Sequence, residues 1–224
     1  MPRHLQRALN HLKQQILSLG AVVEDSMRKA VRALEDRDTK LAETVIDTDP
    51  EVDKAEVELE EECLQILALH QPVAIDLRFI VAVLKINNDL ERIGDLAVNI
   101  AERALFIAEH NGTDFPLDFE EMAAESQRMV SQSLDALVNM DADLARRVCR
   151  EDDTVDAINR EMYMEVEKGI RENPDHMESL IHLLSASRHL ERIADHATNI
   201  AEDVVYMVEG DIIRHHPEDY RSSR

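Results

Sequence analysis

The chain of 224 residues is long enough for one large domain or two small domains, each with a real core. Apolar residues make up 44% and aromatic residues only 3%, with five glycines and six prolines, which is typical of a helical protein and excludes a sheet-rich one. The formal net charge of −22 disfavours direct binding to nucleic acid and to anionic lipid headgroups.

The first half of the chain has the pattern of three long helices. Apolar residues recur three or four positions apart from the beginning of the chain, which predicts a helix that ends near the segment LEDRDTK. Asp38 is expected to cap a second helix that runs to about His70. Pro72 disfavours helical backbone in the residue before it, and Asp76 is expected to cap a third helix that extends to about His110.

The second half repeats the first. Residues 33–53 align with residues 136–156 at an offset of 103, and the offset falls to 100 near the end of each half. The turn signal NGTDFP, at residues 111–116, lies between the halves. We therefore predict an all-α fold of two tandem three-helix bundles that arose by internal duplication, over residues 1–110 and 117–210. Residues 111–116 would be a linker and residues 211–224 a flexible tail.

Two matching motifs, LERIGDLAVNIAE at residues 90–102 and LERIADHATNIAE at residues 190–202, agree at ten of thirteen positions. On a helix, each motif places its carboxylates and its amide on the side opposite the apolar residues. Glu91 and Asp95 are like charges four residues apart, a pair that destabilises a bare helix, and Glu191 with Asp195 repeats it. The plain interpretation is a solvated face, but retention of the unfavourable pair in both halves indicates a further role.

The preceding helix of each half carries a second pair of carboxylates. If neighbouring helices bring the pairs together, a multivalent cation with oxygen ligands would remove their repulsion. Asp49 has an alternative role as a helix cap, because Pro50 follows it. Mg²⁺, Ca²⁺, Mn²⁺ and iron suit such ligands, and Zn²⁺ can use carboxylates. The candidate metal ligands are Asp49, Asp53, Glu91, Asp95 and Asn99 in the first half, and Asp152, Asp156, Glu191, Asp195 and Asn199 in the second.

Other residue patterns give little support for catalysis. Cys63 and Cys149 lack the spacing of a thiolate zinc site or a disulfide framework. His182, His189 and His196 recur every seven residues, which favours partly exposed bundle positions over a metal site. No Gly-rich phosphate-binding motif occurs, and no apolar run approaches the length of a membrane span. We therefore expect a cytoplasmic protein that is not an enzyme and binds no nucleotide.

The chain resembles the PhoU family of phosphate-uptake regulators over nearly its whole length. The resemblance is carried by LERIGDLAVNIAE, SRHLERIADHATNIAED and QPVAIDLRFIVAVLKINNDLERIGD. It implies a cytoplasmic homodimer that restrains phosphate uptake and phosphate-starvation signalling by binding partners at the inner membrane, without inserting into it. The implied partners are the ATPase subunit of the phosphate ABC transporter and the sensor histidine kinase of the phosphate regulon. It also implies multinuclear iron or zinc on the residues named above.

Two features differ between the halves or from the family pattern. Pro50 follows Asp49, and the first half has Asp89 where the second has His189, so unequal metal occupancy of the two halves is expected. The carboxylates alone also allow a metal-dependent or metal-storing helical protein. A helical scaffold with solubilising acidic faces is a third possibility.

Overall fold

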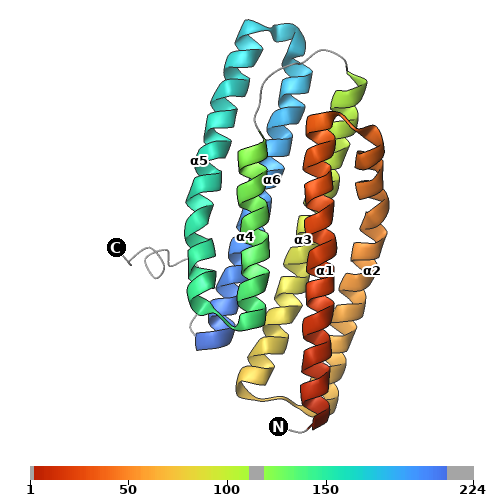
Figure 1. Cartoon of the computed structure of the whole chain (residues 1–224), viewed down its shortest axis with the longest axis vertical. Helices are drawn as coiled ribbons and strands as arrows, with labels where there is room; N and C mark the ends of the chain where they lie inside the picture. The colour runs from red at the N-terminus through yellow and green to blue at the C-terminus, as the bar shows by residue number, and fades with distance from the viewer. Residues whose placement is uncertain (1–2, 111–118, 211–224) are drawn as a thin grey trace.

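The computed structural model describes residues 3–110 and 119–210, so the predicted linker and tail lie outside the described residues. The described part is all-helical, with the long helices running along the long axis of the molecule (Figure 1). The helices are α1 (Arg3–Asp36), α2 (Thr39–His70), α3 (Ala74–Glu109), α4 (Glu120–Asn139), α5 (Ala142–Glu172) and α6 (Met177–Glu209), with a short 3₁₀ turn (Pro174–His176) before α6. This confirms the predicted fold class.

Aspartate caps start the second helix of each half. Asp38 accepts hydrogen bonds from the backbone N–H groups of Lys40 and Leu41, at 3.0 and 3.1 Å, as its position before α2 predicted. Asp141 accepts one from the N–H of Leu144 at 2.8 Å at the start of α5. These side chains satisfy backbone donors that a helix leaves unpaired in its first turn.

The predicted cap of α3 is wrong, and the alternative role of Asp49 as a cap is not found. The N-cap of α3 is Val73, which makes no side-chain capping bond, and Asp76 lies inside the first turn of the helix. A carboxylate there still interacts favourably with the positive end of the helix dipole. Asp49 does not cap a helix either, because α2 continues through Pro50 from Thr39 to His70. The Asp49 side chain is therefore not used to start a helix.

The two halves pack against one another as well as within themselves. Within the first half α1, α2 and α3 are in mutual contact, α6 packs on both α4 and α5 in the second, and α3–α6 and α1–α4 contacts join the halves. The core is built of leucine, isoleucine, valine, alanine and methionine, with α3 and α6 contributing the most buried positions. The chain runs in opposite directions along α3 and α6 (Figure 1). No described helix is long and apolar enough to cross a membrane.

Candidate functional site

The structure brings the predicted metal ligands together in two groups. The first acidic face consists of Asp49 and Asp53 on α2 with Glu91, Asp95 and Asn99 on α3. The second acidic face consists of Asp152 and Asp156 on α5 with Glu191, Asp195 and Asn199 on α6. Each face therefore combines two neighbouring helices of one half, because α2 packs on α3 and α5 packs on α6.

The carboxylates of the first acidic face are close enough to affect one another's ionisation. Partial burial raises the pKa of Asp49, and the negative charges of Asp53 and Asp95 raise it further. Partial burial also raises the pKa of Glu91, with a further rise from Asp95. Because Asp49 and Asp95 belong to different helices, this repulsion acts across the α2–α3 contact. The carboxylates of the two helices are therefore electrostatically coupled.

One arginine partly compensates this charge. Arg92 places Nε 3.4 Å from Oε2 of Glu91 and Nη1 3.3 Å from Oδ2 of Asp95. About half of the Arg92 side chain is exposed, at 52%, so solvent weakens both ion pairs. Asn99 donates a hydrogen bond from Nδ2 to the backbone oxygen of Asp95 at 2.8 Å, which holds the amide on the same helix face.

The second acidic face is the more strongly perturbed. Burial raises the pKa of Asp152 to about 6, with further contributions from Asp195 and Asp156. Burial and the charge of Asp195 also raise the pKa of Glu191. Asp195 is exposed as a whole residue, yet partial burial of its carboxylate raises its pKa, and the charge of Asp156 raises it further. The fold therefore holds carboxylates that repel one another across the α5–α6 contact.

A polar contact beside each acidic face was not anticipated from the sequence. Asn87 is buried and donates from Nδ2 to the backbone oxygen of Glu56 at 2.9 Å and to its Oε1 at 3.2 Å. In the second half, Ser187 donates from Oγ to Oδ1 of Asn159 at 2.6 Å. Asn87 and Ser187 are equivalent at the offset of 100 residues, so both halves fix the same pair of helices by a polar bond. The sequence offered one sign of these contacts, because Asn87 and Ser187 are polar residues at buried positions.

The acidic faces have the donor chemistry of a metal site, although their side chains are spread apart. In residues 3–110 and 119–210, no three His, Cys, Asp or Glu side chains converge closely enough to hold a metal ion. Glu91 Oε2 is shielded from solvent and makes no hydrogen bond, and its one charged neighbour at ion-pair distance in the described residues is Arg92. Oxygen ligands on two open helix faces fit hard cations, with water completing the coordination. Rotation of the side chains would be needed to bring them onto one ion.

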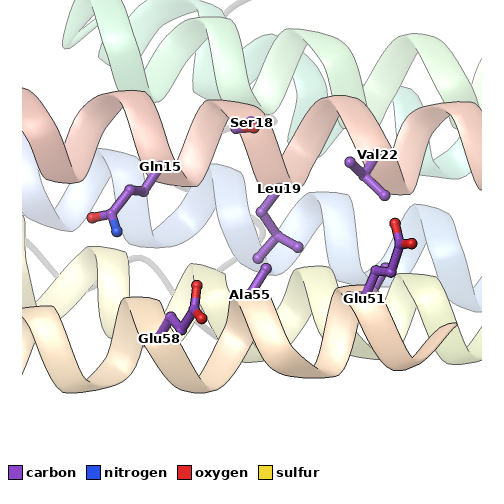
Figure 2. Close-up of a pocket in the computed structure, with 8 residues that line it drawn as sticks. Gln15, Ser18, Leu19, Val22, Glu51, Ala55 and Glu58 are labelled. Atoms are coloured by element: carbon purple, nitrogen blue, oxygen red, sulfur yellow. The ribbon is translucent and has the colours of Figure 1, made fainter. Parts of the chain in front are cut away.

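A separate groove lies between α1 and α2 and has no catalytic character. It has a volume of about 260 Å³. Figure 2 shows Leu19 and Ala55 pointing toward each other across its floor, with Gln15 and Glu58 at one end and Val22 and Glu51 at the other. The residues that line this groove include no nucleophile paired with a base, so we assign it no chemistry.

Comparison with known proteins agrees with this architecture. The PhoU domain family matches residues 16–104 and 119–204, one match in each half of the chain. A phosphate-specific transport system accessory protein PhoU homolog of Pseudomonas aeruginosa is 39% identical over 210 residues, covering 92% of this chain and 86% of that protein. A homolog of the same description from Aquifex aeolicus is 38% identical, covering 94% of this chain and 96% of that protein.

Solved structures show the same fold. The crystal structure of PhoU from Pseudomonas aeruginosa superposes with a TM-score of 0.87 at 38% sequence identity, covering 92% of this chain and 99% of that one. The phosphate transport system regulatory protein PhoU from Streptococcus pneumoniae superposes with a TM-score of 0.81 at 29% identity, covering 93% and 98%.

Proposed function

Because the chain belongs to the PhoU family, we propose that this phosphate-transport accessory protein represses phosphate uptake when phosphate is plentiful. It is a regulator and not an enzyme. The match of the PhoU domain in both halves is the observation that carries the proposal. The regulator acts by binding other proteins, and it restrains both the phosphate ABC transporter and the phosphate-starvation two-component system.

Its partners are the ATPase subunit of that transporter and the sensor histidine kinase of the phosphate regulon. The net charge of −22 supports attachment to the membrane through these proteins, since anionic lipid headgroups repel such a chain. The protein works in the cytoplasm as a homodimer. Pull-down of membranes with and without the transporter tests attachment through partners, which predicts binding only when the transporter is present. Binding to protein-free anionic vesicles would contradict attachment through partners.

The two acidic faces support a bound metal that neutralises repelling carboxylates. Iron or zinc, or another divalent cation such as Mg²⁺, Mn²⁺ or Ca²⁺, would be held by the carboxylates of Asp49, Asp53, Glu91 and Asp95 in one half, and of Asp152, Asp156, Glu191 and Asp195 in the other. Asn99 and Asn199 add amide oxygens. A bound cation supplies positive charge at these places and so changes the surface that a partner meets. Occupancy differs between the halves, because Asp152 is the most strongly perturbed of the ligands.

A deletion and complementation experiment tests the regulatory role. Deleting the gene should leave phosphate uptake and starvation-induced genes active in high phosphate, and the full chain should restore repression. A chain carrying Glu91→Gln, Asp95→Asn, Glu191→Gln and Asp195→Asn should restore it less well. Glu161→Gln with Glu165→Gln is the matched control, because these exposed residues of α5 have the same four-residue spacing. Normal repression in the deletion strain would contradict the proposed function.

A further inference from the structure

Ion pairs join the two halves near the N-terminal half of α3. Lys85 Nζ lies 3.0 Å from Oδ1 of Asp203, whose side chain is only 4% exposed. His196 Nδ1 lies 2.8 Å from Oδ1 of Asp89. In both pairs α3 of the first half meets α6 of the second, and the carboxylate is largely buried. A carboxylate of one half therefore meets a basic side chain of the other half at this end of the α3–α6 contact.

The duplication should repeat these pairs at the other end of the contact, but the residues there differ. At the offset of 100 residues, the position of Asp89 is taken by His189 and the position of Asp203 by Arg103. Both carboxylates of the first end are thus replaced by nitrogen bases. His189 and Arg103 lie near each other, since the charge of Arg103 helps to lower the pKa of His189. The basic partners change as well, because Ser185 stands at the position of Lys85 and Leu96 at the position of His196.

Aromatic stacking holds Arg103 in place. Its Nη1 lies 3.4 Å from Nδ1 of His182. The Phe106 ring stacks on His182 with 3.6 Å between ring centroids, and on His110 with 4.0 Å. Glu102, which is 50% exposed, is the acidic partner of Arg103, with its Oε2 3.1 Å from Nη2. A single exposed carboxylate screens little of the charge that gathers here.

A recess on the surface of α6 opens beside this cluster. It has a volume of about 390 Å³ and is lined by Ile181, Leu184, Ser185, Arg188, His189 and Arg192. Arg188 and Arg192 are exposed, lie one helical turn apart, and form no ion pair with any residue that the structure describes. Ser185 Oγ lies 3.2 Å from Nε2 of His189, and both residues line the recess.

Carboxylates of the second acidic face lie close to the recess. Glu191 stands between Arg188 and Arg192 in the sequence, and Asp195 follows Arg192 by three residues. In the described part of the chain neither arginine forms an ion pair with these acids, and both arginines line the recess.

We propose that this recess binds a phosphate-type oxyanion, either inorganic phosphate or a phosphoryl group of a small metabolite. Two guanidinium groups that form no ion pair within the described residues present forked N–H donors that match a phosphate, and the Ser185 hydroxyl adds a donor. The proposal rests on these side chains and does not depend on the proposed regulatory role.

Calorimetric titration of the full chain tests the site. Inorganic phosphate, pyrophosphate and ATP are titrated separately, and sulfate serves as a comparison anion. The wild type should bind at least one phosphate compound more tightly than sulfate, and Arg188→Gln with Arg192→Gln should weaken that binding by about tenfold or more, since two charge-assisted hydrogen bonds are lost. Binding of inorganic phosphate identifies the free anion as the source, whereas binding of only pyrophosphate or ATP identifies a metabolite.

The matched control is Arg7→Gln with Arg160→Gln, which removes two exposed arginines outside the recess and changes the net charge equally. It should bind as the wild type does. Circular dichroism establishes that each variant is folded, and the exposed positions of all four arginines make this the expected result. Absence of binding by all three phosphate compounds, equal affinity for sulfate, unchanged binding in the Arg188 and Arg192 variant, or an equal loss in the control would each overturn the proposal.

Discussion

At the scale of single residues, Asp152 shows how an acidic face stores unfavourable charge. Its pKa rises from 3.8 to about 6, first because of burial and then because of Asp195 and Asp156. Between about pH 4 and 6, the folded chain therefore keeps a proton on this carboxyl that the unfolded chain has already released. Stability falls as pH rises through this window, and above it the whole unfavourable contribution remains.

Asp152→Asn should remove this contribution. In the presence of a chelator at pH 7.5, we expect the variant to be more stable than the wild type by about 1–2 kcal/mol, a value discounted from the full shift because the carboxylate keeps some contact with solvent. At pH 4 the difference should nearly vanish, since the wild-type carboxyl is then protonated in the folded state. Urea unfolding at the two pH values measures both quantities.

The control for this measurement is Asp47→Asn, which neutralises an exposed carboxylate of α2. Its effect should stay within about 0.5 kcal/mol at either pH, as is usual for surface positions. A gain for Asp152→Asn that is the same at pH 4 and at pH 7.5 would contradict the assignment, because it would not follow the titration of this carboxyl.

At the scale of helices, close approach between α1 and α4 depends on Gly20. A Cβ atom placed there would overlap Cδ1 of Leu134, which comes from the other half of the chain. By contrast, a Cβ at Gly94 would lie 3.2 Å from Cγ1 of Val52, a tight but smaller conflict. The second half has Ala194 at the position equivalent to Gly94, so this fold accommodates a methyl group there.

We expect Gly20→Ala to lower the free energy of unfolding by about 1 kcal/mol, because displacement of Leu134 outweighs the better helix propensity of alanine. Gly94→Ala should be neutral or stabilising by up to about 0.5 kcal/mol, since the same gain in propensity meets a smaller conflict. Thermal and urea unfolding of the two variants beside the wild type measure the difference. Equal stability of the two variants would show that α1 and α4 are not packed as closely as described.

The helices that a sequence predicts best are those with local signals. Asp38 was predicted as a cap and is one, because an N-cap needs only its own next residues. The predicted start of α3 at Asp76 was wrong, since Ala74 and Ile75 join the helix without any capping side chain. Pro50 suggested a helix start, but tertiary packing of α2 on α1 and α3 carries the helix through it.

At the scale of the whole molecule, repetition in the sequence revealed two similar halves but not how they meet. The offset of 100 residues relates Asp89 to His189, and nothing local indicates that Asp89 pairs with His196 of the other half. Contacts of this kind join residues more than one hundred positions apart and depend on the docking of two bundles. The acidic faces were predictable from helix periodicity, whereas the recess on α6 was not predicted, because a run of surface side chains along one helix does not indicate a hollow between them.

The proposed metal binding concerns the whole molecule, because each half carries one acidic face. Without metal, repulsion within each face lowers stability. A cation that binds only the folded chain raises the free energy of unfolding, by an amount that grows with the ratio of the cation concentration to the dissociation constant. Divalent iron, manganese or zinc should therefore raise the melting temperature of the wild type. Glu91→Gln with Asp95→Asn should lose part of the increase, and adding Glu191→Gln with Asp195→Asn should abolish it.

Metal content and melting temperature should be measured on the same samples after chelation and reloading. The variant with all four carboxylates neutralised should bind little metal and, in chelator, should melt above the wild type because its internal repulsion is relieved. Glu161→Gln with Glu165→Gln, a pair of equal spacing on the exposed surface of α5, should bind and melt like the wild type. If added metals leave wild-type melting unchanged while the neutralised variant is simply more stable, the two faces are solvated surfaces, and the proposed metal sites are wrong.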